Sequence, residues 1–156
     1  MSTNNEIHAV TIDRIVDAMR VFDVELERHP ENEVATANLN GLPMTFAVLG
    51  STAIIRADSV TDQVLNDADP TLYLAANQVN CVSFGARATI VDRAETLIVR
   101  TERDLPIAAG MTDAQLSASL RDGVDAVLAT HDGIKAAAED LSEVRAAVEK
   151  QLAEED

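Results

Sequence analysis

The sequence predicts an α+β fold: an antiparallel β-meander flanked by an N-terminal helix, a short central helix and a long C-terminal helical segment. Three observations predict it. Apolar residues recur at helical spacing near the N-terminus. A stretch of period two follows, and the turn signals Asn40-Gly41 and Gly50-Ser51 divide it. A capping box at Thr112 then opens a long helical pattern. This order of elements is typical of α+β domains and differs from alternating βαβ units.

The N-terminal helix is predicted to begin after Thr11, a good N-cap residue. Its apolar stripe is Ile12, Ile15, Val16, Met19 and Phe22. Three meander strands are predicted over residues 34–39, 44–49 and 53–58. Asn40-Gly41 joins the first two strands, because both positions of such a tight turn need positive φ.

The second half is predicted to begin with a short helix from Thr71 to Asn80. A fourth strand follows, with one face formed by Phe84, Ala86, Ala88 and Ile90. A fifth strand is predicted over residues 97–102. The C-terminal helix starts at the capping box formed by Thr112 and Gln115. We expect Asp132-Gly133 to break or kink this helix, because glycine weakens a helix interior.

A second apolar pattern runs along the C-terminal part of the chain, at alternating spacings of three and four. It resembles a coiled-coil seam of two to three heptads. We interpret Ile134, Leu141, Val144 and Val148 as a candidate partner or dimer interface. The alternative is that the seam packs in cis on its own domain. The sequence is therefore divided into a core over residues 10–131 and a helical extension over residues 132–156.

Composition excludes several classes of function. The formal net charge of −15 disfavours nucleic acid and anionic membrane surfaces, which bind through cationic side chains. Cys81 is the single cysteine, so no internal disulfide can form, as suits a reducing compartment. We find no secretory signal and no apolar stretch of membrane-spanning length. These observations predict an acidic cytoplasmic protein.

No catalytic constellation is visible. His8, His29 and His131 are scattered without ligand spacing, and His131 is expected near the end of a helix. Cys81 is interpreted as a core thiol. The six glycines form neither a phosphate loop nor a nucleophile elbow. We therefore predict no catalytic residue, no metal ligand and no cofactor, so the protein is not expected to be an enzyme.

The central helix carries polar residues at both ends. Asp69 and Thr71 are spaced like part of a calcium loop, but a turn with a helix cap explains them better, because the required glycine is missing. Asn77 and Asn80 lie on one side of the helix. Their amides can satisfy the last carbonyls of the helix or hydrogen-bond an adjacent strand. The alternative is a polar recognition site.

The pattern resembles the YbjN family, described as putative bacterial sensory transduction regulators, from Thr11 to about Leu128. The resemblance rests on the order of elements and on Ala76-Asn77-Gln78-Val79-Asn80, which closes the central helix directly before a strand. It also rests on Gly110, shortly before the C-terminal helix. The family often has an aromatic residue before the second asparagine, where this chain has Val79. The resemblance implies a fold similar to type III secretion chaperones, which are often dimeric and bind proteins through apolar patches.

Two hypotheses of function follow. The first is a non-catalytic, chaperone-like or regulatory adaptor that binds a protein partner as a homodimer. The second is a small-molecule sensor or enzyme that uses a pocket between sheet and helices, with Asn77 and Asn80 as polar contacts.

Overall fold

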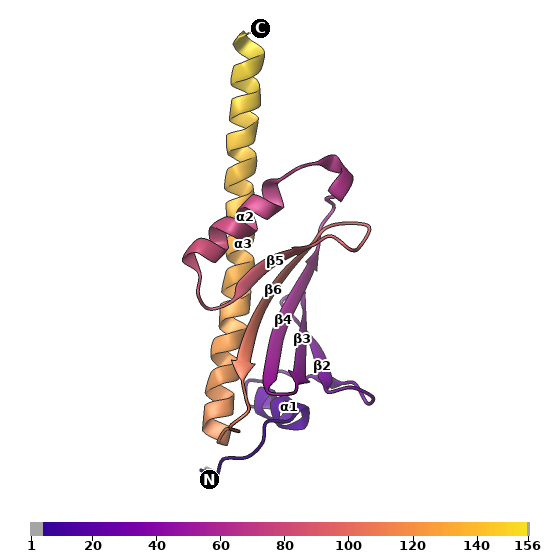
Figure 1. The fold of residues 1–156 in the computed structure, drawn as a ribbon, viewed down its shortest axis with the longest axis vertical. Coiled ribbons are helices and arrows are strands. Elements are labelled where there is room, and N and C mark those ends of the chain that lie inside the picture. Colours follow the sequence, from indigo (N-terminus) through magenta and orange to yellow (C-terminus); the bar gives the residue numbers. More distant parts are fainter. Residues whose placement is uncertain (1–4, 156) are drawn as a thin grey trace.

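A computed structural model describes residues 5–155 (Figure 1). It contains one six-stranded antiparallel sheet, in the order β1-β2-β3-β4-β6-β5, and three α-helices. The predicted α+β class is confirmed. The elements are α1 (Ile12–Arg20), β1 (Glu27–Arg28), β2 (Val34–Leu39), β3 (Leu42–Leu49), β4 (Thr52–Val60), the 3-10 turn η1 (Leu65–Asp67), α2 (Thr71–Val82), β5 (Arg87–Val91), β6 (Ile98–Pro106) and α3 (Asp113–Glu155).

Turns and caps lie where the local sequence requires them. Asn40 and Gly41 both have positive φ, at 55° and 82°, and connect β2 to β3 as a tight hairpin. The Thr11 hydroxyl accepts a hydrogen bond from the N–H of Arg14 and caps α1. At the start of α3, the Thr112 N–H donates to Gln115 Oε1 at 2.9 Å, and the Gln115 N–H donates to Thr112 Oγ1 at 3.2 Å. The predicted capping box is therefore confirmed.

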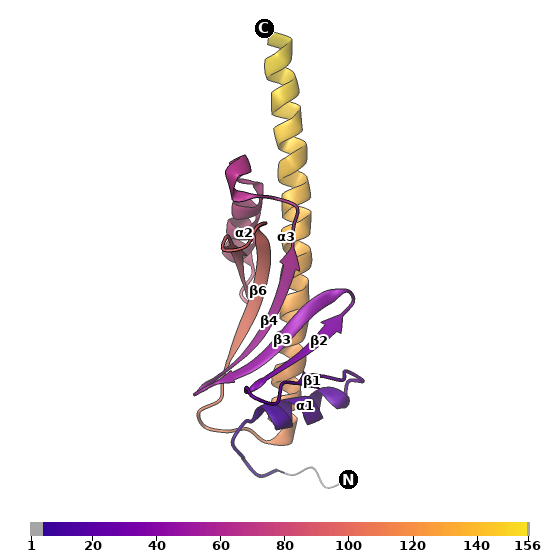
Figure 2. The ribbon, with the colours of Figure 1, turned by 90° about the vertical axis from the view of Figure 1, so that its right-hand side faces the viewer.

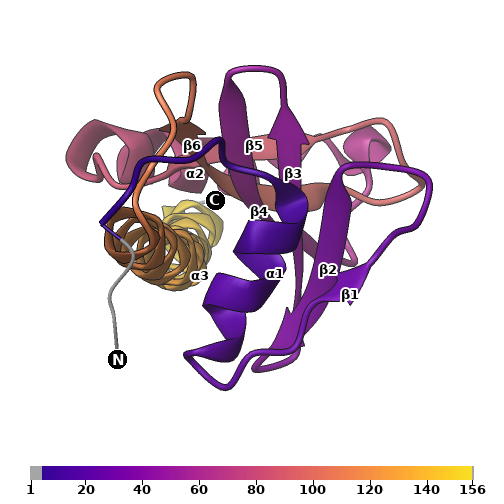
Figure 3. The same cartoon turned by 90° about the horizontal axis from the view of Figure 1, so that it is seen from below.

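One face of the sheet carries the core. The helices α1 and α3 lie on the same side of the sheet, as the view from below shows (Figure 3). Phe46 and Ile55 form a cross-strand pair between β3 and β4 and are buried against these helices. A second apolar cluster joins α2, β5, β6 and the middle of α3, through Ala75, Val79, Ala88, Val99 and Ile134.

The opposite face of the sheet is covered with ion pairs. Glu102 on β6 accepts hydrogen bonds from Arg56 at 2.8 Å and from Arg87 at 3.0 Å, while Arg100 pairs with Asp58 at 2.8 Å. Burial raises the pKa of Glu102, but the hydrogen bonds from its two arginines outweigh burial and hold the pKa below its usual value. Because these charges are already paired with one another, this face offers little apolar surface to a partner.

Three local predictions are wrong. The chain does not break at Asp132-Gly133, and α3 runs without interruption over 43 residues. Gly133 is tolerated because α3 packs against α2 and the sheet on this stretch, so tertiary packing offsets the weak helix propensity. Phe84 belongs to the loop before β5 and is 93% exposed. Phe22 lies beyond the end of α1, in a turn.

The length of α3 dominates the shape of the molecule. A helix of 43 residues is about 65 Å long. Its first part packs on the sheet, and its C-terminal part extends well beyond every other element (Figures 1 and 2). A short helix like the projecting part is only marginally stable in water by itself. The part of α3 that packs on the sheet therefore supplies the helical nucleus from which the projecting part continues.

Candidate functional site

A groove runs between the C-terminal half of α2 and the middle of α3. Its volume is about 710 Å³. Most of its lining is small or apolar: Val79, Val82, Gly85, Ala126, Ala129, Gly133, Ala136 and Ala137. A few polar groups join them, including Thr130 and Asp140. Four other hollows of residues 5–155 measure about 220 to 420 Å³, so this larger and mostly apolar groove is our candidate functional site.

Small residues create this groove. A Cβ atom at Gly85 would lie 2.9 Å from the Cβ of Ala126, so the loop after α2 approaches α3 as closely as its glycine permits. A Cβ atom at Gly133 would lie at ordinary contact distance, 3.6 Å, from a methyl of Val79. The hydroxyls of Ser83 and Thr130 lie 3.3 Å apart and tie the end of α2 to α3.

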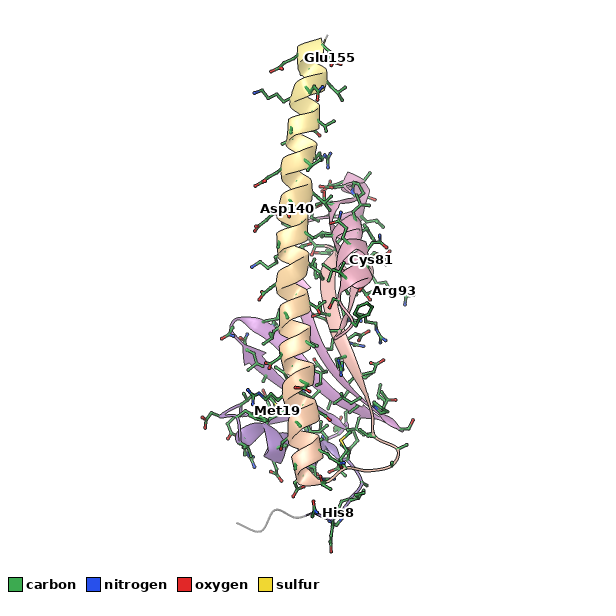
Figure 4. The ribbon with its side chains drawn as sticks, turned by 90° about the vertical axis from the view of Figure 1, so that its left-hand side faces the viewer. His8, Met19, Cys81, Arg93, Asp140 and Glu155 are labelled. Carbon is green, nitrogen blue, oxygen red and sulfur yellow. The ribbon has the colours of Figure 1, made fainter. Side chains whose placement is uncertain are left out.

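The groove continues onto the projecting end of α3. Ala126, Gly133, Ala137, Val144 and Val148 follow one another at spacings of seven, four, seven and four, which places them on one face of the helix. We call this face the apolar track. Its first three members line the groove. Its last two are exposed and lie in the stretch between Asp140 and Glu155, where the side chains of α3 project into solvent (Figure 4).

The structure divides the predicted interface residues into two pairs. Ile134 is 1% exposed and belongs to the cluster beneath α2, and Leu141 packs against the same cluster. The seam therefore packs in cis as far as Leu141. Val144 is 61% exposed and Val148 is also exposed, as is Leu152 one turn further on. Only this second part of the seam is available to another molecule.

Two further apolar side chains are exposed beside the groove. Val82, at the end of α2, lines the groove and is 78% exposed. Phe84 stands in the chain between the lining residues Ser83 and Gly85. Phe84 was predicted to lie on a strand face, so the exposure of this aromatic side chain was not foreseen. Contiguous apolar surface of this kind marks interaction sites.

Asn80 is bonded to the edge of the sheet. Its Nδ2 donates to the carbonyl of Ala88 at 2.9 Å, and its Oδ1 accepts from the N–H of Ala88 at 2.8 Å. Because β5 is an edge strand, the amide takes the place of a neighbouring strand at this residue. Of the three roles considered for Asn80, the structure thus shows the hydrogen bond to an adjacent strand. Asn77 is exposed on α2 and forms no side-chain hydrogen bond within residues 5–155.

We expect Asn80→Ala to lower the free energy of unfolding by about 1 to 2 kcal/mol, because two hydrogen bonds to a part-buried backbone are lost. Urea unfolding measures this loss, and hydrogen exchange of the Ala88 amide should quicken. Asn77→Ala is the matched control and should change stability by less than about 0.5 kcal/mol. Equal effects of the two substitutions would contradict the edge-cap role of Asn80.

His131 lies in the interior of α3 and not near a helix end, so that prediction is wrong, because the helix continues past Gly133. It lines a hollow of about 310 Å³ beside Ser59, Thr61 and Lys135. Burial lowers the pKa of His131 below its usual value, and Lys135 adds to this effect while Asp132 opposes it. At neutral pH the ring is therefore uncharged.

The remaining candidate residues for chemistry are dispersed. Asp69 Oδ1 accepts from the N–H of Thr71 at 3.0 Å and from its hydroxyl at 2.6 Å, which confirms a turn with a helix cap. Cys81 is exposed at the end of α2, so its interpretation as a core thiol is wrong. Within residues 5–155, no group of three or more His, Cys, Asp or Glu side chains gathers closely enough to hold a metal ion.

No helix within residues 5–155 combines the length and the apolar character that crossing a membrane requires.

The fold and the groove define a class of small α+β domains in which helices back one face of an open antiparallel sheet. The chain belongs to the YbjN family: the family model, described as "Putative bacterial sensory transduction regulator", matches residues 11–135. The resemblance seen in the sequence is confirmed. None of the curated proteins matches the sequence significantly.

Two solved structures are similar to this chain. One is YbjN from E. coli, described as a putative transcription regulator, with a TM-score of 0.69 and 13% identity, covering 86% of this chain and 96% of that one. At this identity the likeness establishes the fold alone. The other is the HopA1-SchA chaperone-effector complex, with a TM-score of 0.49 and 8% identity, covering 83% of this chain and 98% of that one.

Proposed function

We propose that this protein is a non-catalytic cytoplasmic adaptor, of a chaperone-like or regulatory kind, that binds a protein partner along α3. The observation that carries the proposal is the apolar track, which runs from the α2–α3 groove to Val144 and Val148 on the projecting end of the helix. A protein gains nothing in its own stability from exposed apolar residues on a projecting helix, whereas a partner that covers them gains the free energy of their burial.

The family description as a regulator supports a role in binding rather than in catalysis. The packing of the groove supports it as well. Its walls are helices whose backbone groups are already bonded, and its lining residues are mostly alanine, glycine and valine. Such a surface can bind an apolar partner, but it offers few groups that could transfer a proton or act as a nucleophile.

A homodimer is part of the same proposal, and it would use the exposed end of α3. Val144, Val148 and Leu152 are exposed there, and the glutamates of residues 142–155 are accompanied by Arg145 and Lys150. Arg145 pairs with Glu149 and Lys150 lies 4.0 Å from Glu154, so repulsion between two such ends is moderated.

We expect Val144→Asp to weaken self-association or partner binding at least tenfold while changing the free energy of unfolding by less than about 0.5 kcal/mol, because the side chain is exposed. The measurement is affinity capture by the tagged full chain from a lysate of the source cells at physiological salt, with light-scattering mass determination of the purified chain. Val60→Asp, at an exposed valine of β4, is the matched control.

A stoichiometric partner or a dimer that is lost with Val144→Asp and kept with Val60→Asp would support the proposal. A monomeric chain that captures nothing, or identical behaviour of the two variants, would contradict it.

Small-molecule sensing is the second candidate. The hollow beside His131 favours it, because an uncharged half-buried imidazole lies there with the hydroxyls of Ser59 and Thr61. A metabolite that binds this hollow would raise the melting temperature by mass action, and the rise should vanish in His131→Ala. Asn80 does not contribute to this hollow, because its amide is bonded to β5.

A further inference from the structure

Four carboxylates lie beside the apolar track on α3. Asp125, Asp132, Asp140 and Glu143 are all exposed, and none of them forms an ion pair within residues 5–155. In contrast, Arg145 on the same helix pairs with both Asp69 and Glu149. These four negative charges, spread over about 27 Å of helix, are thus free to pair with cations of another molecule.

These carboxylates flank the groove. Asp125 and Asp132 are one turn before and one turn after Ala129, a lining residue, and Asp132 is also one turn from the lining residue Ala136. Asp140 itself lines the groove, and Glu143 follows it by one turn and lines the neighbouring hollow beside Thr71. We call these four residues the acidic rail. Arg121 and Lys135 are each one turn from a member of the rail, but neither forms an ion pair with it within residues 5–155.

We infer that the groove binds a basic amphipathic helix of a partner protein, whose apolar face covers the track and whose Lys and Arg side chains pair with the acidic rail. The inference rests on the proposed function and names the chemistry of its partner. Opposite charges beside an apolar groove select a partner of opposite sign and speed its association. The length of the rail matches a helix of about 18 residues.

A helix fits the groove better than an extended peptide does. The wall formed by α3 has no free backbone groups, and the wall formed by α2 offers only the carbonyls of its last turn, so no row of alternating N–H and C=O groups is available to pair with a strand. An extended segment would therefore bury unsatisfied N–H and C=O groups against alanine and valine, whereas a helix satisfies its own. Small residues such as Gly133 and Ala129 let the backbone of such a helix approach α3 closely.

A second copy of this chain is a poorer occupant of the groove. Two tracks facing each other would bring two acidic rails together without cations between them, and like charges at an interface cost several kcal/mol. The end of α3 beyond Glu143 is different, because the cations Arg145 and Lys150 are present there.

The test uses a synthetic 18-residue peptide with leucines at helical spacing and lysines on one flank, measured against the full chain by fluorescence anisotropy at two salt concentrations. Two control peptides have the lysines replaced by glutamates, or the same composition in scrambled order. The scrambled peptide separates groove binding from general attraction to a chain of net charge −15.

Two protein variants separate the rail from total charge. D125N/D132N/D140N/E143Q removes the rail, and E27Q/E31Q/D92N/E95Q removes four exposed carboxylates elsewhere, so both have the same net charge. We expect the amphipathic lysine peptide to bind at least tenfold more tightly than either control peptide. Loss of the rail should weaken it at least tenfold, equivalent to about 1.4 kcal/mol, whereas the control variant should change it less than twofold.

Equal binding of the amphipathic and scrambled lysine peptides would overturn the inference, as would equal effects of the two charge variants. Ala129→Trp, which fills the groove from an exposed position, provides the remaining check. A purified dimer that dissociates with Ala129→Trp would place a second copy in the groove and overturn the inference. A captured partner that is lost with Ala129→Trp but still binds the variant without the rail would also overturn the inference. That outcome would leave the proposed adaptor function intact.

Discussion

Ile134→Asp is expected to lower the free energy of unfolding by about 3 to 5 kcal/mol, because it combines the loss of a buried aliphatic side chain with an unpaired buried charge. Ile134 is almost fully covered by α2 and the sheet, so water cannot solvate the new carboxylate without opening the second apolar cluster. Since single domains are stable by about 5 to 15 kcal/mol, this variant should show a markedly reduced urea midpoint.

Val144→Asp is the natural comparison, because it makes the same kind of change ten residues further along the same helix. The sequence pattern treats the two positions as equivalent, whereas the structure places one in the core and the other in solvent. Similar losses of stability at the two positions would mean that the projecting end of α3 packs in cis, and the division of the seam at Leu141 would then be wrong.

Gly123→Leu should lower the free energy of unfolding by about 1 to 3 kcal/mol, the usual cost of overpacking a well-filled core. Gly123 is buried where α3 crosses β4, and a Cβ atom there would lie 2.5 Å from the Cδ1 atom of Ile55. Ile55 is itself buried opposite Phe46, so its side chain has little room to move aside. Thermal and urea unfolding both measure the effect.

Gly133→Ala is the matched control for helix propensity. A Cβ atom at Gly133 would meet the methyls of Val79 at 3.6 and 3.8 Å, which are ordinary contact distances. Alanine is favoured over glycine in a helix by about 1 kcal/mol, so this substitution should stabilise the protein. If Gly123→Leu were as harmless as Gly133→Ala, the close approach of α3 to β4 would not be a packing constraint.

The elements that the sequence predicted correctly are those whose signals are local. The hairpin at Asn40-Gly41 and the capping box at Thr112 and Gln115 depend on backbone conformation within a few residues, and both are present in the structure. The short strand β1 was missed, because two residues carry no periodicity and Glu27–Arg28 pairs with β2 only through the tertiary fold.

The candidate site was predictable only in part. The seam from Ile134 to Val148 was visible as a pattern, and Val144 and Val148 are exposed as an interface requires. The groove was not predictable, because it depends on α2 crossing α3 at Gly133, a residue that the local rules treated as a break. The exposure of Phe84 was missed for a related reason. The loop before β5 contacts α3 at Gly85, which lies against Ala126, and the strand begins only at Arg87, so Phe84 is outside the strand.

By itself the sequence determined the α+β class, the family and the long apolar pattern of the C-terminal helix. Turns, caps and periodicity can be read from the sequence because each depends on residues that are close together in the chain. Only the tertiary structure decided which part of that pattern is buried. An apolar residue at helical spacing packs against whatever lies beside it, and Leu72 at the beginning of α2 packs in the same cluster as Leu141. Up to Leu141 the seam stabilises its own domain, and beyond Leu141 the same spacing leaves Val144 and Val148 exposed for another molecule.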